Sequence, residues 1–240
     1  MGFLVFQLQA PLASWGEPAV GEYRGSHGYP GESALVGLLG AALGVRREDE
    51  AAHAALRQGY GFAVGVQSTG KLLRDYHTAQ VPGRTSLKGR PHGNRRDELQ
   101  VPKDELNTIL STRDYRQDAA CLVAVQPGKE APYALEVLSN ALRNPRFVLY
   151  LGRKSCPPAV PLYPLIIDVE LALEAINIYR ERLGQVCHEE IGRVLQLAWS
   201  EKIEAGVPAD LSSPRKDRLI RRGAWQFGDR TEHVALFESE

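Results

Sequence analysis

The order of strand-like and helix-like periodicity constrains the fold of this chain more than any other feature. Residues 3–10 alternate as a strand with Leu4, Phe6 and Leu8 on one face. Glu32 to Leu43 then has the spacing of a helix that ends near Gly44. The further elements expected are a helix over 47–58, a strand over 61–67, extended chain over 71–78, a strand over 119–126, a helix over 132–144 and a strand over 147–151.

This succession predicts an α+β fold, in which residues 1–159 form a ferredoxin-like or RRM-like β-α-β-β-α-β domain. Many RNA-binding modules use this unit, because its four-stranded face can present aromatic and basic groups. Residues 160–240 are expected to form a small C-terminal β-rich subdomain. Its expected elements are a helix over 168–178 and strands over 194–199 and 231–237. The fold alone does not decide the function.

A long stretch without periodicity, residues 80–110, interrupts the predicted domain. It carries several prolines and glycines and few apolar residues, so it cannot form its own core. Insertions of this length are usually functional or mobile, and this one is expected to be a projecting hairpin or a loop. Between residues 84 and 96 it holds no acid but five cations, namely Arg84, Lys88, Arg90, Arg95 and Arg96.

The overall charge gives no argument for an acidic partner, because 29 basic residues balance 29 acidic ones. Any surface for nucleic acid must therefore come from local segregation of charge. Basic residues concentrate in three islands, at 84–96, 143–154 and 215–222, and the first two contain no acid. A single run of charge usually marks a solvated face, but two acid-free islands favour contacts with phosphate groups.

Composition and motifs also argue against several classes of protein. The apolar runs are short, whereas a spanning helix needs roughly 20 apolar residues, and the start lacks the basic region of a signal peptide. The three cysteines form no CxxC pair, and there is no carboxylate cluster, P-loop or dinucleotide fingerprint. We therefore expect a cytoplasmic protein with no membrane segment, no metal and no cofactor.

Three segments carry more specific information. The first is Ala10–Gly16 together with Tyr29–Gly44, the second is Leu73–Thr78, and the third is Tyr150–Pro157. Their tyrosines can stack on unpaired bases, and their arginines and lysine can contact phosphates. Candidate RNA-binding residues within these segments and the intervening loop are Ser14, Trp15, Arg24, Arg74, Tyr76, His77, Tyr150, Gly152, Arg153, Lys154 and Ser155.

Some of these residues have a structural alternative. Trp15 serves either as a hydrophobic anchor or as a stacking platform, and the glycines of 16–31 either cradle RNA or only turn the chain. Gly152 lets a nucleotide approach the backbone closely. Asp75 either belongs to the binding surface or orients Arg74.

In order and spacing, from residue 3 to about residue 160, the three segments resemble the CRISPR-associated RAMP superfamily, in particular its type I-E branch, the CasD subunits of Cascade complexes. The resemblance implies a non-catalytic subunit that binds and caps the 5′ handle of the crRNA. It also implies a contribution to complex assembly and to target DNA recognition in antiviral defence. The implied partners are crRNA, CasC-type backbone subunits, the CasA-type large subunit and target DNA. Residues 80–110 resemble the thumb of that family in position and charge.

The alternative function is a metal-independent endoribonuclease that processes CRISPR repeat RNA, an activity that the resemblance associates with another subtype. Such an enzyme needs a general base and a general acid at the scissile phosphate. The candidates are His77, His27, Tyr76 and Lys71. A lone His beside Tyr and Asp is more often a binding or structural residue, which favours the non-catalytic function.

Overall fold

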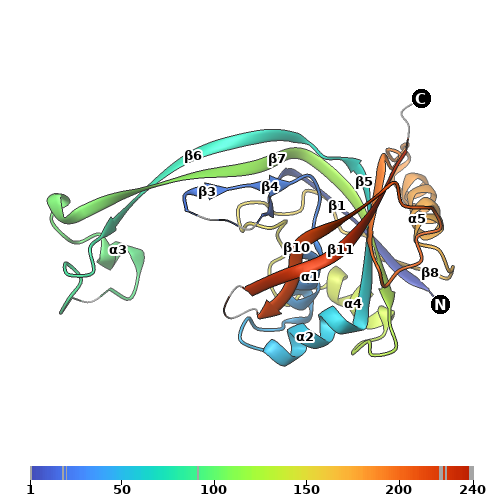
Figure 1. Ribbon diagram of the computed structural model, residues 1–240, viewed down its shortest axis with the longest axis horizontal. Coiled ribbons are helices and arrows are strands. Elements are labelled where there is room, and N and C mark those ends of the chain that lie inside the picture. The colour runs from blue at the N-terminus through green and yellow to red at the C-terminus, as the bar shows by residue number, and fades with distance from the viewer. Residues whose placement is uncertain are drawn as a thin grey trace.

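A computed structural model describes residues 2–17, 19, 21–90, 92–221, 224 and 226–237. Met1 of the predicted domain over 1–159, Pro91 of the insertion and Arg222 of the third basic island lie outside the described residues. Figure 1 shows a body of helices and sheet from which a long two-stranded hairpin projects to one side. In the described part of the chain, no helix is long and apolar enough to span a membrane.

Most strands belong to one sheet, which is antiparallel except where β3 pairs with β7. Within the described residues nine strands form it, in the order β10-β11-β9-β5-β7-β1-β8, with β3 and β6 also paired to β7. The strands are β1 (Phe3–Ala13), β3 (Tyr23–Arg24), β5 (Tyr60–Ser68), β6 (Lys71–Pro82), β7 (Leu106–Pro127), β8 (Leu165–Ile167), β9 (Gln196–Ser200), β10 (Leu211–Arg221) and β11 (Gln226–Leu236). A separate pair consists of β2 (Trp15–Gly16) and β4 (Ser26–His27). The helices are α1 (Glu32–Leu43), α2 (Glu50–Gly59), α3 (Arg95–Glu98), α4 (Leu135–Arg143) and α5 (Ala172–Cys187), with one 3₁₀ turn at Lys103–Glu105.

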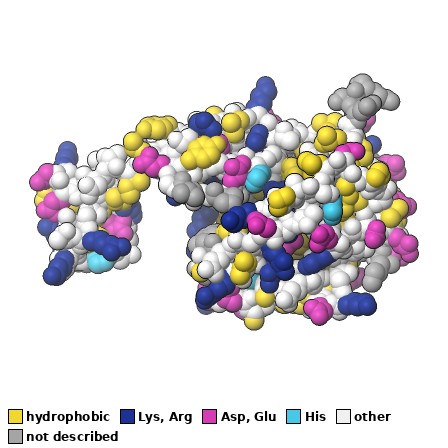
Figure 2. Space-filling model, viewed as in Figure 1, with side chains coloured by type: hydrophobic (Ala, Val, Ile, Leu, Met, Phe, Trp, Pro, Cys, Tyr) yellow, Lys and Arg dark blue, Asp and Glu magenta, His cyan; other side chains and the backbone are white. Residues whose placement is uncertain are grey.

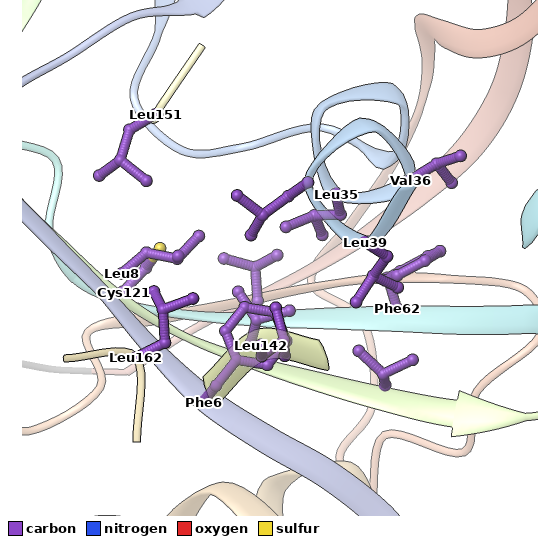
Figure 3. Packing of buried hydrophobic residues seen from close by; sticks show 14 of the residues in the cluster. Phe6, Leu8, Leu35, Val36, Leu39, Phe62, Cys121, Leu142, Leu151 and Leu162 are labelled. Carbon is purple, nitrogen blue, oxygen red and sulfur yellow. The ribbon is translucent and has the colours of Figure 1, made fainter. Parts of the chain in front are cut away.

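Both faces of the sheet are buried in the body. On one face Phe6 and Leu8 of β1 belong to a core cluster with residues of α1 and α4, and Figure 3 shows Leu35, Leu39 and Leu142 in the same cluster. On the other face α5 packs over the apolar side chains of β1, β5 and β7 that point away from this first cluster. The open sheet face that RNA-binding modules of this type present is therefore covered here, and a binding surface has to lie elsewhere.

The strand predicted over 147–151 is wrong. This segment has no regular structure, and the sheet edge beside β1 is formed by β8 instead. The backbone N–H groups of Arg146 and Phe147 donate to Ala42 and Ala41, at the C-terminal end of α1. Because these donors close a helix end, they are not available for a strand ladder.

The C-terminal strands continue the main sheet. β9 pairs with β5, and β11 and β10 follow outward from β9. The helix expected over 168–178 begins at Ala172 and runs on to Cys187. The sequence did not predict β10, because its inward positions Arg215 and Asp217 are charged and hide the apolar alternation.

Those inward charges form a buried ionic network that holds β10 and β11 against the start of α1. Arg230 contacts Asp217 (Nε–Oδ1 2.6 Å) and Glu232 (Nη2–Oε1 2.7 Å). Arg215 pairs with Glu232 (3.0 Å), and the backbone N–H of Glu32 donates to Asp217 (2.9 Å). Asp217, on β10, therefore caps the N-terminus of helix α1. Arg215 belongs to the third basic island but is buried, so it is not a surface cation.

The projecting hairpin consists of β6 and the first half of β7, which pair from Lys71↔Gln117 to Pro82↔Leu106. We call residues 71–82 and 106–117 the arm, and residues 83–105 the tip. No described tip residue is buried, as expected for a segment without a core. The arm starts about ten residues before the predicted insertion, so the second segment, Leu73–Thr78, lies on the arm.

Candidate nucleic-acid interface

Three segments far apart in the sequence meet at Asp114, a residue of β7 at the base of the arm. Asp114 is 2% exposed. Its carboxylate accepts hydrogen bonds from Arg74 (Nε–Oδ1 2.8 Å, Nη2–Oδ2 3.1 Å) and from the hydroxyl of Tyr23 (2.6 Å). Its backbone carbonyl accepts from Ser14 Oγ (3.1 Å) and Arg153 Nη1 (3.2 Å). We call these five residues the arm-base cluster.

The charges of the cluster are mutually stabilised. Hydrogen bonds from Arg74 hold the pKa of Asp114 below its usual range, and the hydrogen bond to Asp114 raises the pKa of Tyr23. The carboxylate is therefore ionised and the phenol neutral at pH 7. The side chain of Arg74 remains 54% exposed, although Asp114 holds both its Nε and its Nη2. Its guanidinium lies 5.3 Å from the centre of the Tyr23 ring. A fixed and exposed guanidinium is suited to binding a phosphate or stacking on a base.

The third segment is a tight loop fastened to the end of β1. Leu151 N–H donates to Cys156 O (2.7 Å), and Ser14 N–H donates to Leu151 O (3.0 Å). Gly152 has φ +87°, and a Cβ there would collide with the carbonyl oxygen of Ser14. The close approach that requires glycine is thus made by the protein's own backbone, whereas we had expected a nucleotide there.

Arg153 and Lys154 play different roles in this loop. The guanidinium of Arg153 donates to Arg24 O (3.2 Å) as well as to Asp114, and it lies 4.5 Å from the centre of the Tyr115 ring. Lys154 and Ser155 are exposed beside it, and Tyr150 is partly buried. Arg153 therefore helps to assemble the cluster, while Lys154 extends from it into solvent.

In the first segment, Trp15 is 4% exposed and belongs to the core beside α1, so its ring is not accessible for stacking in this structure. The backbone N–H of Trp15 donates to Ser26 Oγ (3.0 Å), which joins β2 to β4. Arg116 of β7 holds the same loop, because Nε donates to His27 O (3.2 Å) and Nη2 to Ser26 O (3.1 Å). Arg24 is exposed on β3 at the edge of the cluster.

Side chains of the second segment alternate across the arm. Arg74 and Tyr76 share one face, and Tyr76 is 67% exposed. His77 and Asp75 share the other face, with 3.9 Å between His77 Nδ1 and Asp75 Oδ2. The expectation that Asp75 orients Arg74 is wrong, because Asp114 on the neighbouring strand does so.

The four candidate nuclease residues do not form one constellation. Lys71 and His77 are six residues apart on a single strand, which separates them by roughly 20 Å. Tyr76 points to the face opposite His77. His27 lies on β4, where its Nδ1 is 3.8 Å from Oε1 of Glu17, and burial lowers the pKa of His27. In the described residues, moreover, no group of three or more His, Cys, Asp or Glu side chains is placed to hold a metal ion.

Sequence reasoning missed four residues that build the site, namely Tyr23, Asp114, Tyr115 and Arg116. Three of them adjoin one another on β7, where Asp114 stands between arginines and a tyrosine. An acidic residue inside a basic and aromatic run of a strand was the available signal. Its meaning depends on the pairing of β6 with β7, which the sequence pattern does not reveal.

The tip carries its cations on the surface. Arg84, Lys88, Arg90, Arg95 and Arg96 are all exposed. Two of them are held locally, Arg95 by Glu98 (2.6 Å) and Gln80 O, and Arg90 by Gln100 O (3.3 Å). Acids at 97, 98, 104 and 105 complete the tip, and Figure 2 shows both signs of charge on it.

Comparison with known proteins is consistent with this architecture. The sequence model described as "CRISPR-associated protein (Cas_Cas5)" matches residues 3–231. The chain is 34% identical over 198 residues to "CRISPR system Cascade subunit CasD" of Escherichia coli (strain K12), covering 78% of this chain and 81% of the relative.

Two solved structures are similar over nearly the whole chain. One, titled "CRISPR RNA-guided surveillance complex", has a TM-score of 0.64 and 25% identity, covering 98% of this chain and 90% of that chain. The other, "Crystal structure of Cas protein", has a TM-score of 0.61 and 26% identity, covering 98% and 94%. With a family match that extends over most of its length, this chain belongs to the Cas5 family of CRISPR-associated proteins.

Proposed function

We propose that this protein is a non-catalytic subunit of a type I-E Cascade complex that binds and caps the 5′ handle of the crRNA. The observation that carries the proposal is the convergence of three sequence segments on Asp114, which gathers exposed cations and aromatic rings at one place. The likeness to a Cascade CasD subunit and to a chain of an RNA-guided surveillance complex supports it. The protein then acts in the cytoplasm, in antiviral defence.

Within this function the exposed side chains of the arm base contact the RNA. Arg24, Arg74 and Lys154 bind phosphates, Ser155 donates to a phosphate or base, and Tyr76 stacks on an unpaired base. Each such stack contributes roughly 1–3 kcal/mol. His77 and Tyr150 lie at the margin of this surface. Ser14, Trp15, Gly152 and Arg153 act mainly by shaping it, because their groups are buried or engaged with the protein backbone.

The arm and tip form the thumb in this proposal. The tip cations, at 84, 88, 90, 95 and 96, contact the guide or the target DNA, and the assembly partners are CasC-type backbone subunits and a CasA-type large subunit. We also propose that the four strands β8-β1-β7-β5 represent the ferredoxin-like unit, since their order and antiparallel pairing agree with it. The residues that follow β8 then form an extension of that unit.

Salt dependence of handle binding tests the proposal. Filter binding of handle RNA across a salt series is compared for the wild type, for Lys154→Gln, and for Arg153→Gln combined with Lys154→Gln. We expect the slope to fall by about 0.7 for the single variant, which loses one phosphate contact, and by up to twice that for the pair, because Arg153 also holds the backbone of the second contact, Arg24. Arg182→Gln, on α5 at the opposite side of the sheet, is the control and leaves the slope unchanged. An unaltered slope in the double variant contradicts handle binding at this surface.

The alternative, cleavage of repeat RNA, makes a different prediction. Recombinant protein incubated with repeat RNA in EDTA leaves the RNA intact if the subunit is non-catalytic. The scattered positions of Lys71, Tyr76 and His77 support this expectation. Specific cleavage at one repeat position, abolished by His77→Ala, would instead establish the nuclease.

A further inference from the structure

The third basic island, residues 215–222, has no part in the function proposed above. Its described residues alternate along β10, with Arg215 and Asp217 buried in the ionic network. Lys216, between these two residues, and Arg218, after them, point outward and are exposed. Successive outward positions on a strand lie roughly 6.6 Å apart, so these two cations form a short row on the body.

Two further cations adjoin this row from other elements. Lys202 follows β9, and its Nζ donates to Arg57 O (2.6 Å) and Gln58 O (3.4 Å) at the C-terminal end of α2. Arg57 therefore lies directly beside Lys202, and its Nε is buried without a hydrogen-bond partner among the described residues. Helix α2 in turn packs against β10. Arg57, Lys202 and Arg218 thus come together from three elements, and we call them the body cation cluster.

The acids near this cluster are already engaged. Asp217 is bound by Arg230 and Arg215. Glu32 is buried, its pKa is raised by that burial, and Arg230 approaches it to 3.8 Å. The pKa of Lys202 is lowered, mainly by burial, although Glu32 acts in the opposite direction, and Arg57 and Arg218 lower it further. The three cations repel one another, and Glu32 offsets only part of this repulsion because its charge is shared with Arg230.

We propose that the body cation cluster binds the phosphodiester backbone of a nucleic-acid strand, at a second site distinct from the arm-base cluster. A phosphate between Arg57, Lys202 and Arg218 relieves their mutual repulsion. Lys216 lies two residues before Arg218 on the same exposed face of β10 and extends the cluster. A line of cations suits a strand with regularly repeated charges better than the scattered carboxylates of a protein surface.

The test uses the intact protein carrying Arg57→Gln and Arg218→Gln, with Lys202 left in place because it closes helix α2. Two probes separate the sources of phosphate, a single-stranded guide RNA without its 5′ handle and a target-length duplex DNA. We expect the salt slope to fall by roughly 0.7–1.8 for at least one probe, corresponding to one or two contacts, and the affinity at low salt to fall several-fold. Unaltered thermal melting shows that the variant is folded.

Two variants run in parallel as controls. Arg182→Gln removes an exposed cation on α5 and leaves the slopes unchanged. Lys154→Gln tests the proposed function alone, because it weakens handle binding without touching the body cation cluster. Failure of either proposal is therefore recognised separately. Unaltered slopes for both probes overturn the inference. If the same double variant also loses a partner subunit during assembly, the cluster faces an acidic protein surface.

Discussion

Arg74 and Asp114 are directly opposite one another in the β6–β7 pairing, and two parallel hydrogen bonds join them, at 2.8 Å from Nε and 3.1 Å from Nη2. The pair closes the arm at the point where it leaves the body. Because the carboxylate is buried and also binds Tyr23, the geometry of Arg74 is fixed before any ligand arrives.

Replacing Asp114 by Asn should disorder Arg74 without changing the size of the side chain. The variant loses the charge that holds the guanidinium, so we expect the affinity for handle RNA to fall roughly tenfold. Filter binding measures the change. Asp75→Asn, on the opposite face of the arm, is the matched control and retains affinity. Equal losses in both variants would mean that Asp114 does not position Arg74.

The same pair predicts a dependence of stability on pH. The pKa of Asp114 is lower in the folded protein than in the unfolded chain, so its contribution is complete above the ordinary value of about 4 and is lost as the pH falls through the depressed value. Urea unfolding between pH 7 and pH 3 measures the free energy of unfolding. In Asp114→Asn the acid-side decline should be shallower. Parallel curves for the two proteins contradict this assignment.

Replacing residues 84–96 by a short Gly/Ser linker should leave the body folded and handle binding nearly intact. Within the described residues the tip buries nothing, so its removal costs no core packing. The loss should appear instead in assembly of the complex or in binding of target DNA. Limited proteolysis of the wild type should cleave the tip first, as expected of a segment without a core. If handle affinity alone collapses, the tip cations belong to the handle site and the thumb assignment is wrong.

Gly70 is the glycine on which the joint between arm and body depends. It has φ +68°, and a Cβ there would meet the carbonyl oxygen of Gln117. Gly70→Ala should lower the free energy of unfolding by about 1–3 kcal/mol, because it combines strain with a backbone collision. Gly16→Ala, where a Cβ has no neighbour within 4 Å, is the control. Chemical denaturation compares the two, and similar small effects would show that the joint tolerates a side chain.

The ionic network under β10 predicts a large effect from a small change. Asp217→Asn leaves Arg230 and Arg215 with one buried carboxylate fewer and weakens the cap of α1. Breaking a buried ion pair typically costs about 3–5 kcal/mol, so the variant should unfold at markedly lower denaturant. Asp229→Asn, an exposed position on β11, should be neutral. A neutral Asp217→Asn would mean that the network contributes no net stability.

Local pattern predicted the elements whose apolar faces follow a simple period. Helix α1 has the predicted bounds, because apolar spacing and Gly44 at φ +81° define it locally. Strand β10 was not predicted, because its inward residues are charged. Segment 147–151 was wrongly predicted as a strand, because its structure depends on hydrogen bonds to a distant helix end. Pattern alone cannot identify such tertiary partners.

The sequence predicted several residues of the candidate site, but it did not predict Asp114, to which they bind. Arg74 and Arg153 stand in recognisable segments, whereas Asp114 acquires its role only through the cross-strand pairing of 74 with 114. Register of this kind is set by the whole hairpin and by the turn conformations at its base.

Strand β7 belongs to both body and arm, and it changes conformation once, at Asp118, where φ is 56°. Ser68 holds this point through a hydrogen bond to Asp118 O (3.1 Å) and another from Gly70 N–H (3.1 Å). Mechanically, the arm is a lever that turns about the joint formed by Asp118 and Gly70. Its twelve paired β6 residues extend roughly 40 Å from the joint, so a rotation of about 10° there displaces the tip by about 7 Å. Whatever stiffens the joint therefore determines how far the tip can reach.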